Sequence, residues 1–301
     1  MGIAQYIKTI GRGSEGARAI SREEAADLWG QLLDGTVTDL EVGAFCLAMR
    51  IKGETPQEMA GFLDATHQRL RRLTGGTAPT VVIPSYNGAR KLPVLTPLLA
   101  LLLAREGLGV LVHGTATESG RVLASDVLLA LGKPALNAIE TIAPGEVAFA
   151  PTALLHPGLQ RLLDVRRTVG VRNSAHSLVK LMNPVQGAGL LITSYTHPEY
   201  AVSMAETLAL TGTAALLLRG TEGEAVADAR RTPRMQAIHH GQLSEVQEAQ
   251  SGTLAQLPAL PSDISVERTA AYIRAVLAGE LAVPTPIAQQ VAQVVRLAQA
   301  L

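Results

Sequence analysis

The sequence predicts an α/β protein with a small all-helical N-terminal domain, residues 1–72, and a larger α/β domain with a mostly parallel sheet, residues 76–301. Its 301 residues are long for one domain and suit a large domain plus a small one. Helical periodicity and capping patterns fill the first part, whereas short apolar runs alternate with helical segments after it. Such alternation is typical of a parallel sheet covered by helices.

Three helices are predicted in the N-terminal domain. Ser21 followed by Glu24 is a capping-box pattern, in which each side chain accepts the other residue's main-chain N–H. Pro56 stands at a first helical position, where its missing N–H costs nothing. The predicted helices run from Ser21 to Leu33, from Thr38 to Gly53 and from Thr55 to about Leu73.

The rest of the chain alternates short apolar runs with helical patterns. The predicted strands are Val81–Ile83, Val110–Val112, Val147–Ala150, Leu190–Ser194 and Ala214–Leu218. The predicted helices cover 98–106, about 119–131, about 158–168, about 174–182 and about 198–211. Two amphipathic segments, about 265–278 and about 284–300, are expected to complete the chain.

Composition limits the function classes. The chain has 26 basic and 26 acidic residues, so attraction to nucleic acid or to an anionic membrane would need a local basic surface. The single cysteine, Cys46, permits no disulfide within the chain and fits a reducing compartment. The N-terminus lacks an apolar signal core, and the longest apolar runs are too short to cross a bilayer. We therefore expect a cytoplasmic protein with no membrane contact.

A loop links the first predicted strand to a long apolar helix. It contains the basic pair Arg90 and Lys91 and is not glycine-rich. Thr96 could cap the helix that begins at Pro97, and the N-terminus of a helix attracts anions. Arg90 and Lys91 could therefore meet a phosphate through side-chain charge, or they could be solvated loop charges.

Several longer strings resemble one enzyme family. The segment LDGTVTDLEVGAFCLAMRIKGET, followed by an α/β domain, resembles anthranilate phosphoribosyltransferase. The strings VIPSYNGARK, VHG, VGVRNSAHSLVKL, THPEY and RGTEGE resemble its YbiB branch, a set of paralogues described as nucleic-acid-binding dimers. The resemblance implies the fold that this family shares with class II nucleoside phosphorylases. It also implies a homodimer formed through the helical domain, which helices from about 155–185 are expected to join.

The resemblance also implies a ligand cleft at the carboxyl ends of the strands. In the family, a Gly-Thr-Gly-Gly-Asp loop presents bare main-chain N–H groups to pyrophosphate. Here Pro84 replaces a glycine and Tyr86 adds bulk, so the loop cannot bind pyrophosphate in the same way. Tyr86 could instead stack on a base. The cleft residues implied are Ser85, Tyr86, Asn87, Gly88, His113, Gly114, Ser119 and Arg121.

The metal site of the family is changed as well. The family carries an adjacent Asp-Glu pair for magnesium, and the matching residues here are Ala225 and Val226, which cannot ligate a hard cation. Glu222 and Glu224 are close in sequence and could substitute only if the loop were rearranged; otherwise they are solvated acids in a turn. We therefore predict no metal or other cofactor and assign no catalytic residue.

Basic residues are the remaining candidates for function. Arg172 matches an arginine that contacts anthranilate in the family. The residues expected to contact phosphate groups are Arg90, Lys91, Arg166, Arg167, Arg172 and Lys180. Each could also belong to a solvated surface. Cationic side chains on flexible stems suit a repeating phosphate backbone, which gives binding with little sequence preference.

Three functions remain open. The leading prediction is a homodimer that binds single- or double-stranded DNA, or RNA, and has lost the transferase activity. The alternative is a phosphoribosyltransferase that acts on an unidentified acceptor, with magnesium near Glu222 and Glu224. In the third, the protein is a scaffold that only dimerises.

Overall fold

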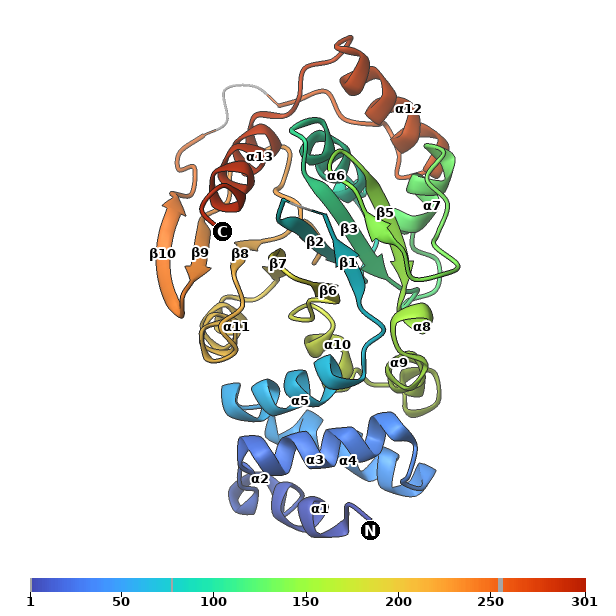
Figure 1. Cartoon of the computed structure of the whole chain (residues 1–301), viewed down its shortest axis with the longest axis vertical. Helices are drawn as coiled ribbons and strands as arrows, with labels where there is room; N and C mark the ends of the chain where they lie inside the picture. The colour runs from blue at the N-terminus through green and yellow to red at the C-terminus, as the bar shows by residue number, and fades with distance from the viewer. Residues whose placement is uncertain (1, 77, 254–256) are drawn as a thin grey trace.

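The computed structural model describes residues 2–76, 78–253 and 257–301 (Figure 1). A helical bundle formed by the N-terminal residues lies at one end of the molecule, and a larger α/β part forms the rest. The bundle helices are α1 (Ala4–Ile10), α2 (Gly13–Gly16), α3 (Arg22–Asp34), α4 (Asp39–Lys52) and α5 (Pro56–Arg69). The predicted fold class, helical domain plus α/β domain, is confirmed.

The predicted starts of the three main bundle helices are also confirmed. Ser21, Thr38 and Thr55 each accept an N–H three residues ahead, and a glutamate there accepts the N–H of the cap residue. The predicted end of the third helix near Leu73 is wrong. Helix α5 stops at Arg69 because Leu70 turns to an extended conformation, and Leu73 begins strand β1 (Leu73–Gly75).

The bundle core is built around three aromatic rings. Trp29 of α3 stacks on Phe62 of α5 at a centroid distance of 4.7 Å, and Phe45 of α4 lies 5.9 Å from Trp29. All three side chains are buried. The indole N–H of Trp29 donates to the hydroxyl of Thr66, 2.8 Å away, so the one polar atom of the ring is satisfied.

A seven-stranded sheet forms the centre of the α/β part, in the order β10-β9-β8-β7-β2-β3-β5. Strands β8, β7, β2, β3 and β5 are parallel, and the β9–β10 hairpin adds two antiparallel strands at one edge. The strands are β2 (Thr80–Ser85), β3 (Gly109–Gly114), β5 (Val147–Pro151), β7 (Gly189–Tyr195), β8 (Ala215–Arg219), β9 (Met235–His239) and β10 (Gln242–Gln247). A small parallel sheet of β4 (Thr141–Ile142), β1 and β6 (Val185–Gln186) lies between the two parts.

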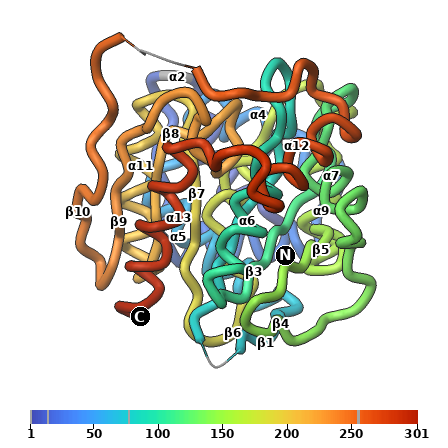
Figure 2. Tube along the Cα trace, turned by 90° about the horizontal axis from the view of Figure 1, so that it is seen from above, coloured from blue at the N-terminus to red at the C-terminus, as the bar shows by residue number. Residues whose placement is uncertain are grey.

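Helices cover both faces of the large sheet. Helices α6, α12 and α13 lie on one face, as the view in Figure 2 shows, and α11 packs against β8 and β9 from the other. Helix α9 contacts α3, and α10 contacts α4 and α5. These helices are α6 (Thr96–Arg105), α7 (Ala124–Ala130), α8 (Thr152–Leu155), α9 (Pro157–Val169), α10 (Ser174–Leu178), α11 (Pro198–Leu210), α12 (Val266–Ala278) and α13 (Thr285–Ala298). No helix among the described residues is long and apolar enough to span a bilayer.

Other details also differ from the sequence prediction. Strands β9 and β10 are not among the predicted strands: β9 breaks its apolar residues with Gln236, and β10 is largely exposed. Helix α7 begins at Ala124 rather than near 119, because Ala89 donates to the carbonyl oxygen of Val122 and holds that segment against the loop after β2. Helix α10 ends at Leu178, four residues before the predicted end.

Replacing Thr66 with valine should destabilise the protein. Valine keeps the shape of the side chain but leaves the buried indole N–H of Trp29 without an acceptor, which costs about 1–3 kcal/mol. Urea unfolding followed by fluorescence measures this, since the sequence has one tryptophan. Thr66→Ser retains the hydroxyl and is the matched control. Equal stability of the wild type and Thr66→Val would contradict the assignment.

Candidate functional site

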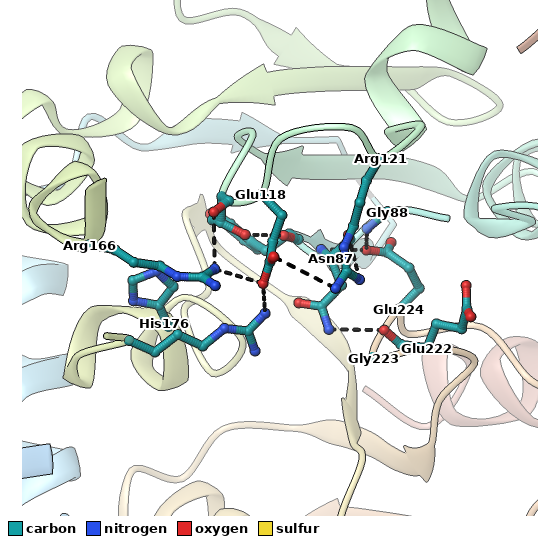
Figure 3. Close-up of polar contacts among 12 residues, drawn as sticks. Asn87, Gly88, Glu118, Arg121, Arg166, His176, Glu222, Gly223 and Glu224 are labelled. Carbon is teal, nitrogen blue, oxygen red and sulfur yellow. Dashed lines mark hydrogen bonds and ion pairs between the residues drawn. The ribbon is translucent and has the colours of Figure 1, made fainter. Parts of the chain in front are cut away.

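The candidate site lies at the carboxyl ends of β2, β3 and β8, the edge at which parallel sheets bind ligands. Three loops meet there: residues 86–92 after β2, 115–123 after β3 and 220–226 after β8. The side-chain amide of Asn87 donates to the carbonyl oxygen of Glu222 at 3.0 Å, and Arg121 donates to the carbonyl oxygen of Asn87 at 3.3 Å (Figure 3). The three loops therefore form one connected polar site.

The carboxylate of Glu224 fills the centre of this site. One of its oxygens accepts the main-chain N–H groups of Asn87 and Gly88, both at 2.8 Å. The other accepts the hydroxyl of Ser85 and the hydroxyl of Thr96, the latter at 3.0 Å. Glu224 is 2% exposed, so this anion is almost fully enclosed. Thr96 is accordingly the first residue of α6 and not its cap, contrary to the prediction.

Glu222 makes a second set of contacts with the same loop. Its carboxylate accepts the main-chain N–H groups of Arg90 at 2.6 Å, Lys91 at 3.0 Å and Leu92 at 3.4 Å. The side chains of Arg90 and Lys91 are exposed. The loop therefore holds an anion through its main chain, whereas the sequence predicted contacts through side-chain charge alone.

The two glutamates do not form a metal site in this structure. Both carboxylates accept hydrogen bonds from the loop after β2. The adjacent Ala225 and Val226 are buried apolar residues. Within the described ranges, no group of three or more His, Cys, Asp and Glu side chains is arranged to hold a metal ion. The expectation that these glutamates are solvated acids in a turn is wrong for Glu224, which is enclosed.

Tyr86 and His113 lie behind the loop rather than on its surface. The Tyr86 hydroxyl is 2.9 Å from Nδ1 of His113 and 3.1 Å from the hydroxyl of Thr152. Burial lowers the pKa of His113 to about 3, so the ring is neutral. Tyr86 is 4% exposed and cannot stack on a base, which corrects that prediction. Gly114 packs so close to the carbonyl group of Ser85 that a side chain there would collide with it.

A basic cluster forms beside the loop, and we define it by Glu118, Arg121, Arg166 and Arg172. The carboxylate of Glu118 accepts hydrogen bonds from Arg166 at 2.7 Å and Arg172 at 2.8 Å, and Arg121 lies 3.8 Å away (Figure 3). The hydrogen bond from Arg166 is the main cause that lowers the pKa of Glu118 to about 2. Three guanidinium groups thus share one carboxylate, which gives the cluster an excess of positive charge. Ser119 is exposed on the same loop.

The other predicted phosphate contacts are dispersed. Lys180 is inside the protein, where its ammonium group donates to the carbonyl oxygen of Gly223 at 3.1 Å, and burial lowers its pKa to about 8. Ser194 donates to the same carbonyl oxygen, also at 3.1 Å. Arg167 is exposed and pairs with Asp164 at 3.3 Å. Lys180 is therefore partly buried and holds the 220–226 loop in place, so its ammonium group is already engaged within the protein.

A pocket of about 380 Å³ lies beside the cluster, between the helical bundle and the α/β part. Arg172, His176 and Lys180 contribute to its walls. Burial lowers the pKa of His176 to about 4, and its Nδ1 lies 3.2 Å from the side-chain oxygen of Asn173. The pocket is large enough for a small polar ligand and lies next to the positive charges of the cluster.

The sequence analysis did not identify Glu118 as a site residue. Its partners Arg166 and Arg172 lie 48 and 54 positions further along the chain, so no local motif links them. One local feature could have indicated Glu118. It is an acidic residue in the string TATESG, in the loop that follows the buried strand β3 and its residue His113.

Comparisons with known proteins place the fold in context. Residues 4–69 match the family model described as "Glycosyl transferase family, helical bundle domain". Among solved structures, anthranilate phosphoribosyltransferase from Thermus thermophilus aligns with a TM-score of 0.70 and 24% identity, over 97% of this chain and 88% of the enzyme. The enzyme from Saccharomyces cerevisiae, in complex with PRPP and Mg, aligns with a TM-score of 0.69 and 16% identity, over 99% of this chain and 89% of that chain. These similarities show the fold.

Sequence relatives show the family. The chain is 39% identical to the uncharacterized protein YbiB of Escherichia coli over 97% of its own length and 93% of that protein. It is 30% identical to the anthranilate phosphoribosyltransferase of Nitratidesulfovibrio vulgaris over 86% of its own length and 75% of the enzyme. The chain therefore belongs to the anthranilate phosphoribosyltransferase family, in the branch that contains YbiB.

Proposed function

We propose that the protein is a homodimer that binds nucleic acid with little sequence preference and has lost the phosphoribosyltransferase activity of its family. The observation that carries the binding proposal is the cluster of Arg121, Arg166 and Arg172 around the single carboxylate of Glu118. Its arginine side chains are 18–38% exposed, so they can reach solvent while Glu118 fixes their positions. Arginine forks held in this way suit phosphate oxygens.

The positions of the other basic residues support an extended contact rather than a single anion site. Arg90 and Lys91 are exposed on the loop after β2, and Arg167 is exposed at the end of α9. Together with the cluster they add exposed cations on the loop after β2 and on α9. A nucleic-acid backbone presents phosphates at regular intervals, so it can use contacts that one small anion cannot reach.

The proposed loss of transferase activity follows from the contacts of Glu224. Its carboxylate already accepts the N–H groups of Asn87 and Gly88 and the hydroxyls of Ser85 and Thr96. A pyrophosphate would need to displace this enclosed anion from the loop. Because Ala225 and Val226 stand where the family carries its acidic pair, the site also lacks ligands that could hold magnesium against the incoming pyrophosphate.

Helix α4 supports the proposed dimer. Leu40, Leu47 and Ile51 are 84%, 47% and 70% exposed, and their spacing places them on one face of the helix. Contiguous exposed apolar side chains are typical of a protein–protein interface. A second copy of the same helical domain is the partner that the family resemblance implies.

Nucleic-acid binding should weaken as salt rises and should depend on the basic cluster. We expect Arg166→Gln combined with Arg172→Gln to lower affinity for a single-stranded oligonucleotide. The slope of log K against log salt should fall by about 0.7 for each phosphate that the variant no longer neutralises. Fluorescence anisotropy at several salt concentrations measures both quantities. Both arginines are partly exposed, so the fold should survive their replacement.

The control for this experiment is Arg105→Gln combined with Arg268→Gln. These arginines are exposed on α6 and α12 and lie outside the site. The control variant therefore removes the same number of positive charges from another part of the surface. Equal decreases of affinity in both double variants would show that the cluster has no special role. Undetectable binding of the wild type at low salt would exclude the proposed function itself.

Substitutions that place charged side chains on the exposed apolar face of α4 should dissociate the dimer. We expect the wild type to have the mass of two chains by light scattering, and Leu47→Glu combined with Ile51→Glu to have the mass of one, because a carboxylate is costly to bury unpaired. Leu129→Glu is the control, since Leu129 is 62% exposed on α7. A monomeric wild type, or a dimeric double variant, would contradict the proposed interface.

Phosphoribosyl pyrophosphate with magnesium should not bind. The carboxylate of Glu224 already accepts the N–H groups of the loop that would bind pyrophosphate. We therefore expect calorimetry to show no saturable heat of binding. The ligand concentrations should be ones that saturate an active anthranilate phosphoribosyltransferase measured in parallel. Magnesium-dependent binding by the wild type would instead favour the alternative function, transfer of a phosphoribosyl group to an unidentified acceptor.

A further inference from the structure

A second site lies on the outer side of the 220–226 loop. A groove of about 1000 Å³ runs between helix α11 and the β9–β10 hairpin. Alanines of α11 form part of its apolar wall, and its polar lining includes Arg219, Arg230, Arg231 and Arg234. Leu92 and Glu222 also line the groove, so the contacts between Glu222 and the loop after β2 lie at its boundary.

Three consecutive N–H groups at that boundary form an anion-binding concavity, the 90–92 nest. The N–H groups of Arg90, Lys91 and Leu92 all point to the carboxylate of Glu222, at 2.6, 3.0 and 3.4 Å. Successive main-chain N–H groups that converge in this way bind anions such as phosphate in other proteins. In this structure the carboxylate of Glu222 occupies the position where these N–H groups converge.

The main chain holds Glu222 at the nest. Glu222 has φ of 54°, a left-handed conformation that costs a residue with a side chain about 1 kcal/mol or more. The conformation is fixed by the side-chain amide of Asn87, which donates to the Glu222 carbonyl oxygen at 3.0 Å, and by Lys180, which donates to the next carbonyl oxygen. The side chain itself is only partly buried and can leave the nest without moving the loop.

The arginines of the groove provide further positive charge. Arg230 pairs with Asp228 at 2.7 Å, and Arg234 pairs with Glu245. Over residues 2–76, 78–253 and 257–301, no acidic side chain lies within ion-pair distance of Arg219 or Arg231. Two guanidinium groups on the groove wall can thus meet an incoming anion without first breaking an ion pair.

We propose that the 90–92 nest binds the phosphate group of a small phosphomonoester that enters this groove, in exchange for the carboxylate of Glu222. A phosphomonoester presents three terminal oxygens to the three N–H groups, whereas a phosphodiester has two. The groove volume suits a ligand of nucleotide size, and its alanine wall suits an apolar portion of the ligand. The nest uses main-chain N–H groups of Arg90 and Lys91, whereas the proposed nucleic-acid contact uses their side chains and the cluster around Glu118, so phosphate binding to the nest can be tested independently.

Replacing Glu222, whose carboxylate competes with phosphate for the 90–92 nest, tests the proposal. We expect Glu222→Gly to bind inorganic phosphate roughly tenfold more tightly than the wild type, because phosphate no longer competes with a tethered carboxylate. Glycine also adopts φ of 54° without strain, so the loop should keep its conformation. Calorimetry gives the affinity, and thermal unfolding confirms that each variant is folded. If Glu222→Gly does not fold, Glu222→Gln removes the charge and keeps the shape.

Glu206→Ala is the matched control. Glu206 lines the same groove and is exposed, so its removal changes the charge of the groove without opening the nest. Equal phosphate affinity in Glu206→Ala and Glu222→Gly would overturn the proposal, because the effect would then be general electrostatics. Adding Arg219→Ala and Arg231→Ala to Glu222→Gly should reverse the gain.

The class of ligand is tested with two further probes. A nucleoside 5′-monophosphate should bind Glu222→Gly at least as tightly as inorganic phosphate does. A dinucleoside phosphate without a terminal phosphate should bind more weakly, because it offers fewer oxygens to the nest. Tighter binding of the dinucleoside phosphate would overturn the assignment to a phosphomonoester.

Discussion

The carboxylate of Glu224 is the contact on which the whole site depends. It joins the loop after β2 to the loop after β8, two strands that are separated in the sheet by β7. Two N–H groups and two hydroxyls converge on this buried anion, so its charge is compensated without a cation in direct contact. Lys180 and Ser194 fix the preceding carbonyl oxygen at Gly223, which keeps the glutamate in position. The N–H groups of the loop after β2 are therefore already bound by a carboxylate of the same chain.

Local patterns predicted most of the fold and little of the site. The capping boxes at Ser21, Thr38 and Thr55 and the apolar parallel strands are encoded within a few residues, so the sequence predicted them well. The contact between Glu224 and Asn87 joins residues 137 positions apart, and no local pattern reveals which N–H groups a distant carboxylate will meet. The β9–β10 hairpin was not predicted because β9 is a short strand with three buried apolar residues and β10 is largely exposed, so neither shows a long apolar run.

The residue type alone also did not show which basic side chains are exposed and which are buried. Lys180 and Arg167 were both predicted to contact phosphate, yet Lys180 is partly buried beside the 220–226 loop and the Arg167 side chain is 73% exposed. The loops that the family resemblance implied for a cleft all follow the carboxyl ends of parallel strands, because topology fixes where those strands end. It could not show that two glutamates would turn inward. The balance of charge over the chain likewise conceals the local excess of arginines around Glu118.

The helical bundle is completed by residues far downstream of it. Arg161 of α9 donates to the carbonyl oxygen of Leu32 at 2.7 Å, and the main-chain N–H of Asn183 donates to His67 at 3.2 Å. The family model ends at residue 69, so the segment that it matches leaves out the α9 and α10 helices that pack against the bundle. If residues 4–69 were expressed alone, α3 would lose its contacts with α9 and α5 would lose its contacts with α10. A transfer of the bundle to another scaffold would therefore have to include α9 and α10.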